Sequence, residues 1–181
     1  MNYYSEFVNA VERTENWGFD PGEITLDKSV SYLDRNSHFE LLELFERNHN
    51  NPFDESLMDC THVSIRMLDS VRDHFSTDAF LTTGDLSSDG ESYYNCSVDY
   101  LKIVARGKEF NPKLNIHMWI TLSSGEIIDF TFFRSMAKAF SRYAPMKSLI
   151  VITPFLEDLQ LVYSPMIIGS DFYKKTGNLI M

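Results

Sequence analysis

The spacing of apolar residues changes from helical to strand-like part-way along this chain, and this change limits the folds open to it. Up to residue 75, apolar residues recur at helical spacing in three segments: residues 3–15, residues 38–48, and a segment that begins between Ser56 and Cys60. From residue 98 onward, short apolar runs alternate with turn residues, which is typical of strands. Helices followed by antiparallel strands predict an α+β fold, with N-terminal helices packed on an antiparallel sheet.

The boundaries of these elements follow from local signals. Ser37 and Glu40 have the spacing of a capping box at the start of the second helix. Residues 76–97 are polar and predict a loop or a strand with long connections. After them we expect a strand near 98–104, a hairpin of 115–122 and 126–132, a helix at 134–143, and strands at 149–152 and 159–163. We predict one domain, 1–181, made of a helical region 1–55, a core 56–132 and a C-terminal helix and strands 133–181.

Composition and charge exclude several classes of protein. With 44% hydrophobic residues among 181, the chain can bury a substantial core. Its net charge of -10 disfavours nonspecific binding to nucleic acid or to anionic membranes. No apolar run approaches the roughly 20 residues that span a bilayer, and the N-terminus lacks the pattern of a signal peptide. We therefore expect a soluble, cytoplasmic protein, although export without an N-terminal signal stays open.

Three residues stand in settings that a thiol nucleophile requires. Cys60 is at the head of the third helical segment, His117 opens the strand 116–122, and Asp129 is on the next strand. A thiol attacks carbonyl groups as thiolate, and the partial positive charge of a helix N-terminus favours that form. A nucleophile also needs a base within hydrogen-bond reach and a third group that orients the base. The order Cys60, His117, Asp129 predicts such a triad.

The hairpin turn tests this prediction. A two-residue turn, Ser124-Gly125, would point His117 and Asp129 to opposite faces of the hairpin. A three-residue turn, Ser123-Ser124-Gly125, would pair His117 with Thr131 and put Asp129 diagonally beside His117 on the same face. Glycine suits the left-handed position that ends a three-residue loop, and Gly125 is at that position. The turn chemistry favours the register that the triad requires.

These motifs resemble a known group of proteins. His117-Met118-Trp119, the glycine turn and Asp129-Phe130-Thr131 look like the His and Asp motifs of transglutaminase-like, papain-fold proteins, and Cys60 at an upstream helix start matches their third element. The resemblance covers residues 56–132. It implies a papain-like core, a nucleophile, base and orienting acid at the three triad positions, and a peptide, protein or amide substrate. No phosphate-binding glycine loop or dinucleotide fingerprint appears in the sequence, so we expect no cofactor.

The chain also departs from that group. Many members carry Gly or Trp beside the cysteine, whereas Asp59 precedes Cys60 here, and its carboxylate opposes thiolate formation. No upstream Gln offers an oxyanion donor, although the amides of Asn50 and Asn51 are candidates. We expect Trp119 to pack in the core of the hairpin or to line the substrate cleft. Cys60 itself has the alternative role of a small core residue.

Other candidate sites are weaker. Cys96 is the rival nucleophile, but no helical pattern follows it, so a structural role is favoured. His62 is turned away from Cys60 on the helix, and the remaining histidines near helix ends are predicted at the surface: His38, His49 and His74. The Cys-x-His spacing of residues 60–62 is unusual for zinc, so we expect no metal site. The competing functions are a cysteine hydrolase or acyltransferase, a noncatalytic binding protein of the same fold, and a regulatory protein with an acidic surface.

Overall fold

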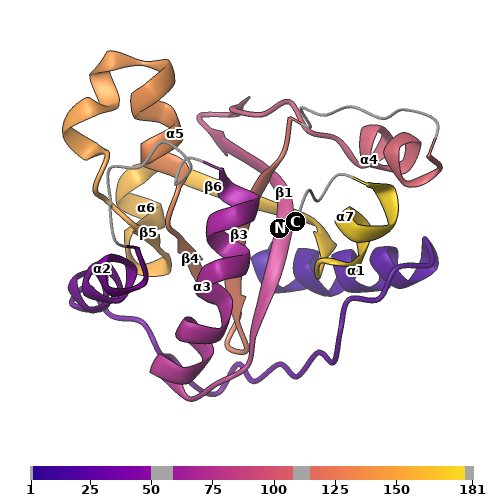
Figure 1. Ribbon diagram of the computed structural model, residues 1–181, viewed down its shortest axis with the longest axis horizontal. Coiled ribbons are helices and arrows are strands. Elements are labelled where there is room, and N and C mark those ends of the chain that lie inside the picture. Colours follow the sequence, from indigo (N-terminus) through magenta and orange to yellow (C-terminus); the bar gives the residue numbers. More distant parts are fainter. Residues whose placement is uncertain (1, 50–58, 108–114, 178–181) are drawn as a thin grey trace. The chain divides into compact units, whose positions relative to one another are not determined.

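The computed structural model describes residues 2–49, 59–107 and 115–177 (Figure 1). Helices and an antiparallel sheet are both present, which confirms the α+β class. The chain forms two compact units, and two of the four boundaries between them fall within strands β1 and β3. Residues 1–24, 81–117 and 160–181 form the first unit, and residues 25–80 and 118–159 form the second.

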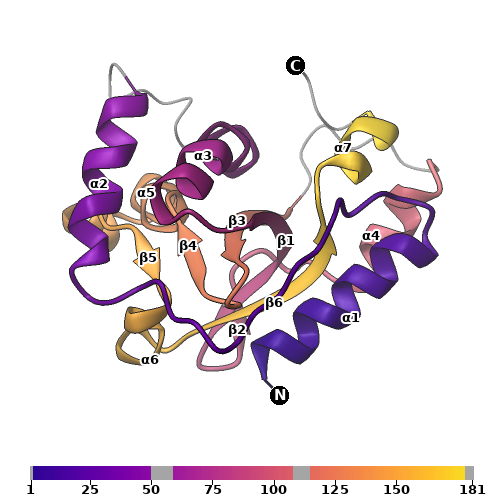
Figure 2. The ribbon, with the colours of Figure 1, turned by 90° about the horizontal axis from the view of Figure 1, so that it is seen from below.

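The first unit is a small sheet covered by helices. Its elements are α1 (Tyr3–Asn16), β1 (Ala79–Ser88) from Leu81 onward, β2 (Glu91–Ser92), α4 (Val98–Ala105), β6 (Leu161–Ile168) and α7 (Asp171–Thr176). Strand β1 pairs antiparallel with β6, from Thr82 opposite Ile168 to Ser88 opposite Leu161, and also with β2. Helix α1 runs beside β6 (Figure 2), where the backbone N–H of Ile168 donates to Thr14 Oγ1 at 3.0 Å.

The second unit holds most of the predicted helices and the hairpin. Its elements are α2 (Ser37–Asn48), α3 (Cys60–Phe75), β3 (His117–Leu122) from Met118 onward, β4 (Ile127–Asp129), α5 (Phe132–Ala139), the 3-10 helices Ser141–Met146 and Thr153–Phe155, β5 (Val151–Ile152) and α6 (Leu156–Leu159). Strand β4 pairs antiparallel with both β3 and β5. Helix α3 lies over β3 and β4 (Figure 2), and its apolar stripe packs into one core: Val63, Met67 and Val71 with Ile120, Leu122 and Ile128.

Three sequence predictions need correction. Residues 98–105 form α4 instead of a strand, because Ser97 Oγ accepts from the N–H of Tyr100 and starts a helix there. Ser37 is the first residue of α2 and not its cap, since Asp34 Oδ1 accepts the N–H groups of Asn36 and Ser37. The helix expected at 134–143 begins and ends earlier, at Phe132 and Ala139.

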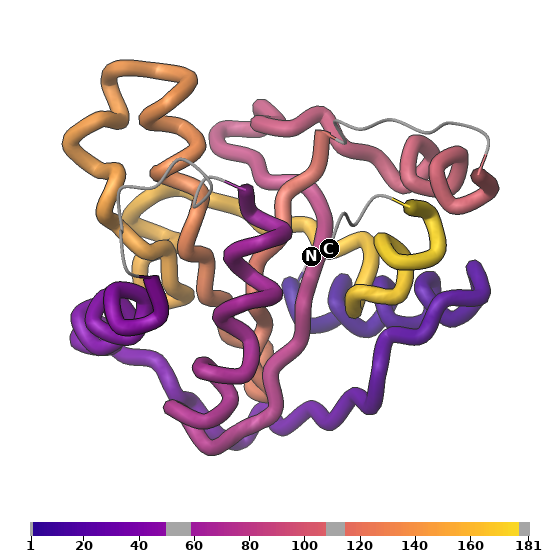
Figure 3. The backbone as a smooth tube through the Cα atoms, viewed as in Figure 1, coloured from indigo at the N-terminus to yellow at the C-terminus, as the bar shows by residue number. Residues whose placement is uncertain are grey.

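For residues 76–97 the sequence left two alternatives, a loop or a strand with long connections, and the structure has the strand β1 within this segment. Figure 3 shows a short connection from α3 into β1. The polar residues Thr82 and Thr83 of β1 are buried, and Thr83 Oγ1 accepts a 2.6 Å hydrogen bond from the hydroxyl of Tyr173 in α7. A partner far along the chain thus satisfies a polar group that made this segment resemble a loop.

Candidate functional site

Cys60 is the first residue of α3, as the sequence predicts. Its thiol is not bonded in a disulfide, and the residue is partly exposed. Asp59 caps the helix: its Oδ1 accepts the N–H groups of Thr61 at 2.9 Å and His62 at 3.1 Å. The Asp59 carbonyl accepts a third N–H, from Val63, at 3.0 Å. Asp59 therefore accepts three N–H groups of the first turn, those of Thr61, His62 and Val63.

Two groups of hydrogen bonds fix α3 along β3. Near the start of the helix, the buried hydroxyl of Ser64 donates to the carbonyl of Met118 at 3.2 Å. Beyond its end, the hydroxyls of Thr77 and Ser123 share a 2.6 Å hydrogen bond, and the N–H of Ser123 donates to the carbonyl of Asp78 at 2.8 Å. Cys60 is one helical turn before Ser64, and therefore on the same face of α3. This face is directed at the Met118 end of β3.

The hairpin has the three-residue turn that the triad requires. Gly125 N–H donates to the Leu122 carbonyl and Leu122 N–H donates to the Glu126 carbonyl, both at 2.8 Å, with Gly125 at φ 86°. In the ladder, Ile120 is opposite Ile128 and Thr121 opposite Ile127. The predicted register is confirmed. Continuing this register by one residue places Trp119 opposite Asp129. Trp119 is fully buried, which agrees with one of the two roles predicted for it, packing in the core of the hairpin.

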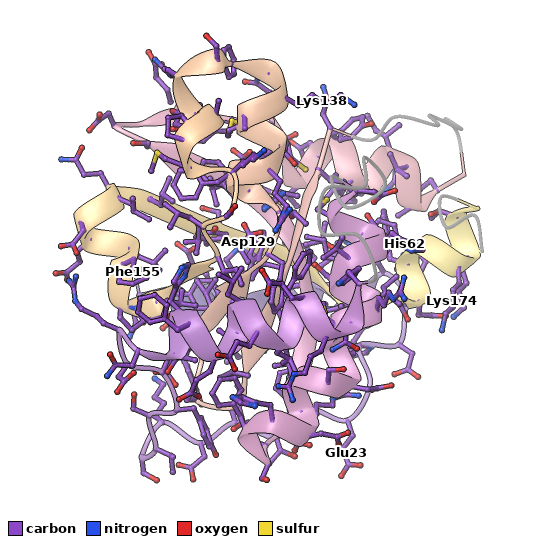
Figure 4. All side chains as sticks on the ribbon, turned by 60° about the vertical axis from the view of Figure 1, so that its left-hand side comes forward. Glu23, His62, Asp129, Lys138, Phe155 and Lys174 are labelled. Atoms are coloured by element: carbon purple, nitrogen blue, oxygen red, sulfur yellow. The ribbon has the colours of Figure 1, made fainter. Side chains whose placement is uncertain are left out.

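Asp129, the last residue of β4, is fully buried in the second unit and lies in its interior (Figure 4). Its Oδ1 accepts three hydrogen bonds: from the N–H of Thr131 at 2.8 Å, from the hydroxyl of Thr131 at 3.2 Å and from the N–H of Phe132 at 3.0 Å. These bonds turn the chain from β4 into α5. Asp129 thus has a structural role that the sequence did not indicate.

His117 is the first residue of β3, belongs to the first unit, and is fully buried. The ring of Tyr94 stacks on its imidazole, with centroids 4.7 Å apart and planes 12° apart. A flat aromatic contact of this kind restricts rotation of the imidazole. Cys60 and Asp129 belong to the second unit, so the approach of the three side chains to one another stays a prediction.

Cys96 lies in the first unit and is buried. Burial, and to a lesser extent the negative charge of Asp85, raise the pKa of its thiol to about 12. A thiol with that pKa stays protonated at neutral pH and is a poor nucleophile. The electrostatics of Cys96 therefore agree with the structural role that the sequence favours.

Two of the histidines predicted at the surface are buried. The Nδ1 of His38 lies 3.2 Å from the carbonyl of Ile150, and the Nδ1 of His49 lies 2.8 Å from the carbonyl of Phe45. The spacing of Phe45 and His49, one helical turn apart, was a signal that could have indicated burial of His49. His74 pairs with Glu40 at 3.2 Å, and His62 is exposed, as predicted. The candidate donors Asn50 and Asn51 lie outside the described residues.

The second unit also has an open polar pocket of about 500 Å³, lined by Thr25, Asp27, Tyr32, Ser76, Thr77, Asp78 and Ser123. It lies at the C-terminal end of α3, which is about 22 Å along the helix from Cys60 at 1.5 Å per residue. The pocket is therefore remote from the proposed nucleophile. Within the described ranges, no group of three or more His, Cys, Asp or Glu residues is arranged to hold a metal ion.

Comparison of the chain with known protein families, with curated proteins and with solved structures finds no match. In the described part of the chain, no helix is both long and apolar enough to cross a bilayer.

Proposed function

We propose that this protein is a thiol-dependent acyl-transfer enzyme, a peptidase, amidase or transglutaminase-like transferase, with Cys60 as its nucleophile. The observation that carries the proposal is the hydrogen bond from Ser64 to the Met118 carbonyl. It directs the face of α3 that bears Cys60 at the end of β3 where His117 precedes Met118. This is also the reaction class that the resemblance to transglutaminase-like, papain-fold proteins implies.

The proposed reaction begins when Cys60 Sγ attacks the carbonyl carbon of an amide or ester. His117 accepts the thiol proton and later delivers it to the leaving amine or alcohol, which departs and leaves a thioester on Cys60. Water or an amine then attacks the thioester while His117 takes its proton; the acyl group leaves as a carboxylic acid or a new amide, and the proton returns to the sulfur of Cys60. The backbone N–H of Cys60 stabilises the oxyanion in both steps of the proposed reaction.

The hairpin register supports the assignment of base and orienting acid. Side chains alternate along a strand, so His117 and Trp119 are on one face of β3, whereas Ile120 and Leu122, on which α3 packs, are on the other. The proposal therefore requires Cys60 to reach His117 around the end of β3 and not across its face. Trp119 is opposite Asp129 in the confirmed register. Thr131 and Phe132 donate their hydrogen bonds to Oδ1 of Asp129. In the proposed mechanism Oδ2 accepts from the imidazole of His117 and holds it in the tautomer that can take the thiol proton.

A second candidate function is a binding or regulatory protein of the same fold without catalysis. The cap of α3 favours it, because Asp59 places a negatively charged carboxylate one residue from the thiol of Cys60. In that case Cys60 is a helix-start residue, and Asp129 serves only to turn the chain into α5.

Alkylation of the purified protein with iodoacetamide across pH 5–9, read by mass spectrometry at each cysteine, separates the two functions. The enzyme proposal predicts that Cys60 reacts at pH 6 at least about tenfold faster than a free thiol with a pKa of about 8.5. Replacing His117 by Gln should abolish that excess reactivity at pH 6. A Cys60 that reacts like a free thiol, or that is indifferent to His117→Gln, would overturn the enzyme proposal and leave the binding function.

A further inference from the structure

One face of α3 carries a row of polar residues toward α2. His62, Arg66, Ser70 and His74 follow one another at four-residue spacing, so they share a side of the helix. Two hydrogen bonds join this side to α2: from Ser70 Oγ to Asn48 Oδ1 at 3.1 Å, and between His74 Nε2 and Glu40 Oε2 at 3.2 Å. His62 and Arg66 lie beyond these contacts toward the start of α3, and both are exposed. They therefore lie near the C-terminal end of α2, where His49 follows.

His49 is 3% exposed and is held in one orientation. Its ring stacks on Phe45 with centroids 4.2 Å apart, and its Nδ1 lies 2.8 Å from the Phe45 carbonyl. A carbonyl can only accept a hydrogen bond, so Nδ1 carries the proton and Nε2 of the neutral ring is an acceptor. Among the residues that the structure describes, nothing hydrogen-bonds to this buried Nε2. A buried polar atom without a hydrogen-bond partner lowers the stability of the fold by about 1–3 kcal/mol unless a ligand or water supplies the missing bond.

The groups around His49 are cationic. The guanidinium of Arg134, from α5, lies 4.5 Å from the centre of the Phe45 ring on which His49 stacks. Burial lowers the pKa of His49, and the charges of Arg66, Arg134 and His62 lower it further. Two acidic groups also act on these residues: the charge of Glu46 acts on Arg134, and the carboxylate of Asp59 accepts the backbone N–H of His62 at 3.1 Å. In a chain of net charge -10, three helices thus bring basic groups together around one unsatisfied imidazole.

We propose that His49, His62, Arg66 and Arg134 form a binding site for an oxyanion, a carboxylate or a phosphate group, which is taken up together with a proton on His49 Nε2. Nε2–H then donates to the anion, and the guanidinium groups supply charge-assisted hydrogen bonds. The protonated imidazole is at the C-terminal end of α2, where the helix dipole favours a cation. The site stands on these residues alone and does not depend on Cys60 chemistry.

Anion binding at this site should depend on pH in one direction, because it is coupled to protonation of His49. Without an anion, the lowered pKa of His49 keeps its ring neutral at pH 7. A bound anion favours the imidazolium and raises that pKa, so binding takes up a proton between the two values. Affinity for the anion should therefore increase as the pH falls from 8 to 6.

Titration of the full chain with inorganic phosphate, and separately with succinate, at constant ionic strength tests the site, with the imidazole NMR signals of His49 as the readout. We expect a saturable shift of the His49 signals with at least one of the two anions, and tighter binding at pH 6 than at pH 8. Saturation with phosphate alone or succinate alone identifies which oxyanion the site prefers. No saturable change at His49 with either anion, or binding that does not tighten toward pH 6, would overturn the proposal.

Matched variants separate a built site from general charge effects. Arg66 is exposed, so Arg66→Gln should leave the fold intact and weaken anion binding at least about fivefold, as loss of a charge-assisted hydrogen bond does. Lys102→Gln makes the same charge change at an exposed position of α4 in the first unit and should alter binding less than about twofold. Equal weakening by both variants contradicts the proposal. Cys60→Ser should leave anion binding unchanged, so a failure of the acyl-transfer proposal is distinguishable from a failure of this one.

Discussion

The hydroxyl of Ser64 donates a 3.2 Å hydrogen bond to the carbonyl of Met118, and this bond sets how far along β3 the helix α3 begins. Cys60 is one turn before Ser64, about 6 Å at the rise of an α-helix. The residue before Met118, about 3.3 Å along an extended strand, is His117. Both steps run toward the same end of β3, so the position of this one hydrogen bond underlies the proposed pairing of nucleophile and base.

We expect Ser64→Ala to lower the free energy of unfolding by about 1 kcal/mol, because it removes a buried hydrogen bond and leaves the Met118 carbonyl without this donor. Urea denaturation at neutral pH measures the change. Ser70→Ala is the matched control, since the bond from Ser70 to Asn48 is only partly buried and should contribute less. A cost for Ser64→Ala no greater than for Ser70→Ala would show that the bond does not hold α3 on β3.

Asp59→Asn separates the contribution of Asp59 to helix stability from the effect of its negative charge on the reactivity of Cys60. Asparagine caps helices about as well as aspartate, so stability should change by less than about 0.5 kcal/mol. Removing a negative charge next to the thiol should increase the alkylation rate of Cys60 at pH 6 by about fivefold, the factor that corresponds to about 1 kcal/mol of screened repulsion.

The comparison variant is Asp59→Ala, which loses the hydrogen bonds to Thr61 and His62 and should cost about 1 kcal/mol of stability. Alkylation kinetics and urea denaturation of both variants provide the measurements. An Asp59→Asn protein whose Cys60 reacts more slowly than the wild type would contradict the view that this carboxylate opposes the thiolate.

The sequence predicted the elements whose signals are local. The predicted start of α3 and the predicted three-residue hairpin turn are both confirmed, because Asp59 caps the helix and Gly125 adopts the left-handed conformation that ends such a loop. These two features constrain the candidate site most strongly. The local signal at Ser97 was equally present, but the apolar residues that follow also fit a strand, and the helix α4 was missed.

The rest depended on contacts between distant parts of the chain. The buried hydroxyl of Thr83 in β1 accepts a hydrogen bond from Tyr173, which is 90 residues away, and no local sequence pattern indicates such a partner. His49 looked like a surface residue at the end of a helix, yet stacking on Phe45 buries it. The structural role of Asp129 at the start of α5 was not predicted either, because it requires the exact turn of the chain after β4.

Cys96 should make stability fall at high pH. Its pKa of about 12 in the folded protein is above the ordinary thiol value, so the unfolded chain loses this proton first as the pH rises. The stabilising contribution is complete below the unfolded pKa, about 8.5, and is lost progressively as the pH rises toward 12. Urea denaturation at pH 8, 9 and 10 should therefore show a decline in unfolding free energy.

The control for that decline is Cys96→Ala, which removes the titrating thiol. Its unfolding free energy should fall less steeply between pH 8 and 10 than that of the wild type, whatever its stability at pH 7. The same burial predicts that iodoacetamide leaves Cys96 unmodified in the folded protein at pH 8. Rapid native labelling of Cys96, or equal slopes for the two proteins, would contradict a buried thiol with a raised pKa.

Two substitutions of Asp129 separate its structural role from its proposed catalytic one. Asp129→Ala removes the acceptor of three hydrogen bonds at the start of α5 and should lower the free energy of unfolding by about 2–3 kcal/mol. Asp129→Asn retains Oδ1 for these donors, so its cost should be about 1 kcal/mol or less.

The Asn variant nevertheless removes the charge that the proposed mechanism uses to stabilise the imidazolium of His117. Alkylation of Cys60 at pH 6 should therefore slow at least about tenfold in Asp129→Asn while the protein remains folded. Urea denaturation and alkylation kinetics on the same samples give both quantities. If Asp129→Asn alkylates at the wild-type rate, the carboxylate has only the structural role of turning β4 into α5, and His117 must act without it.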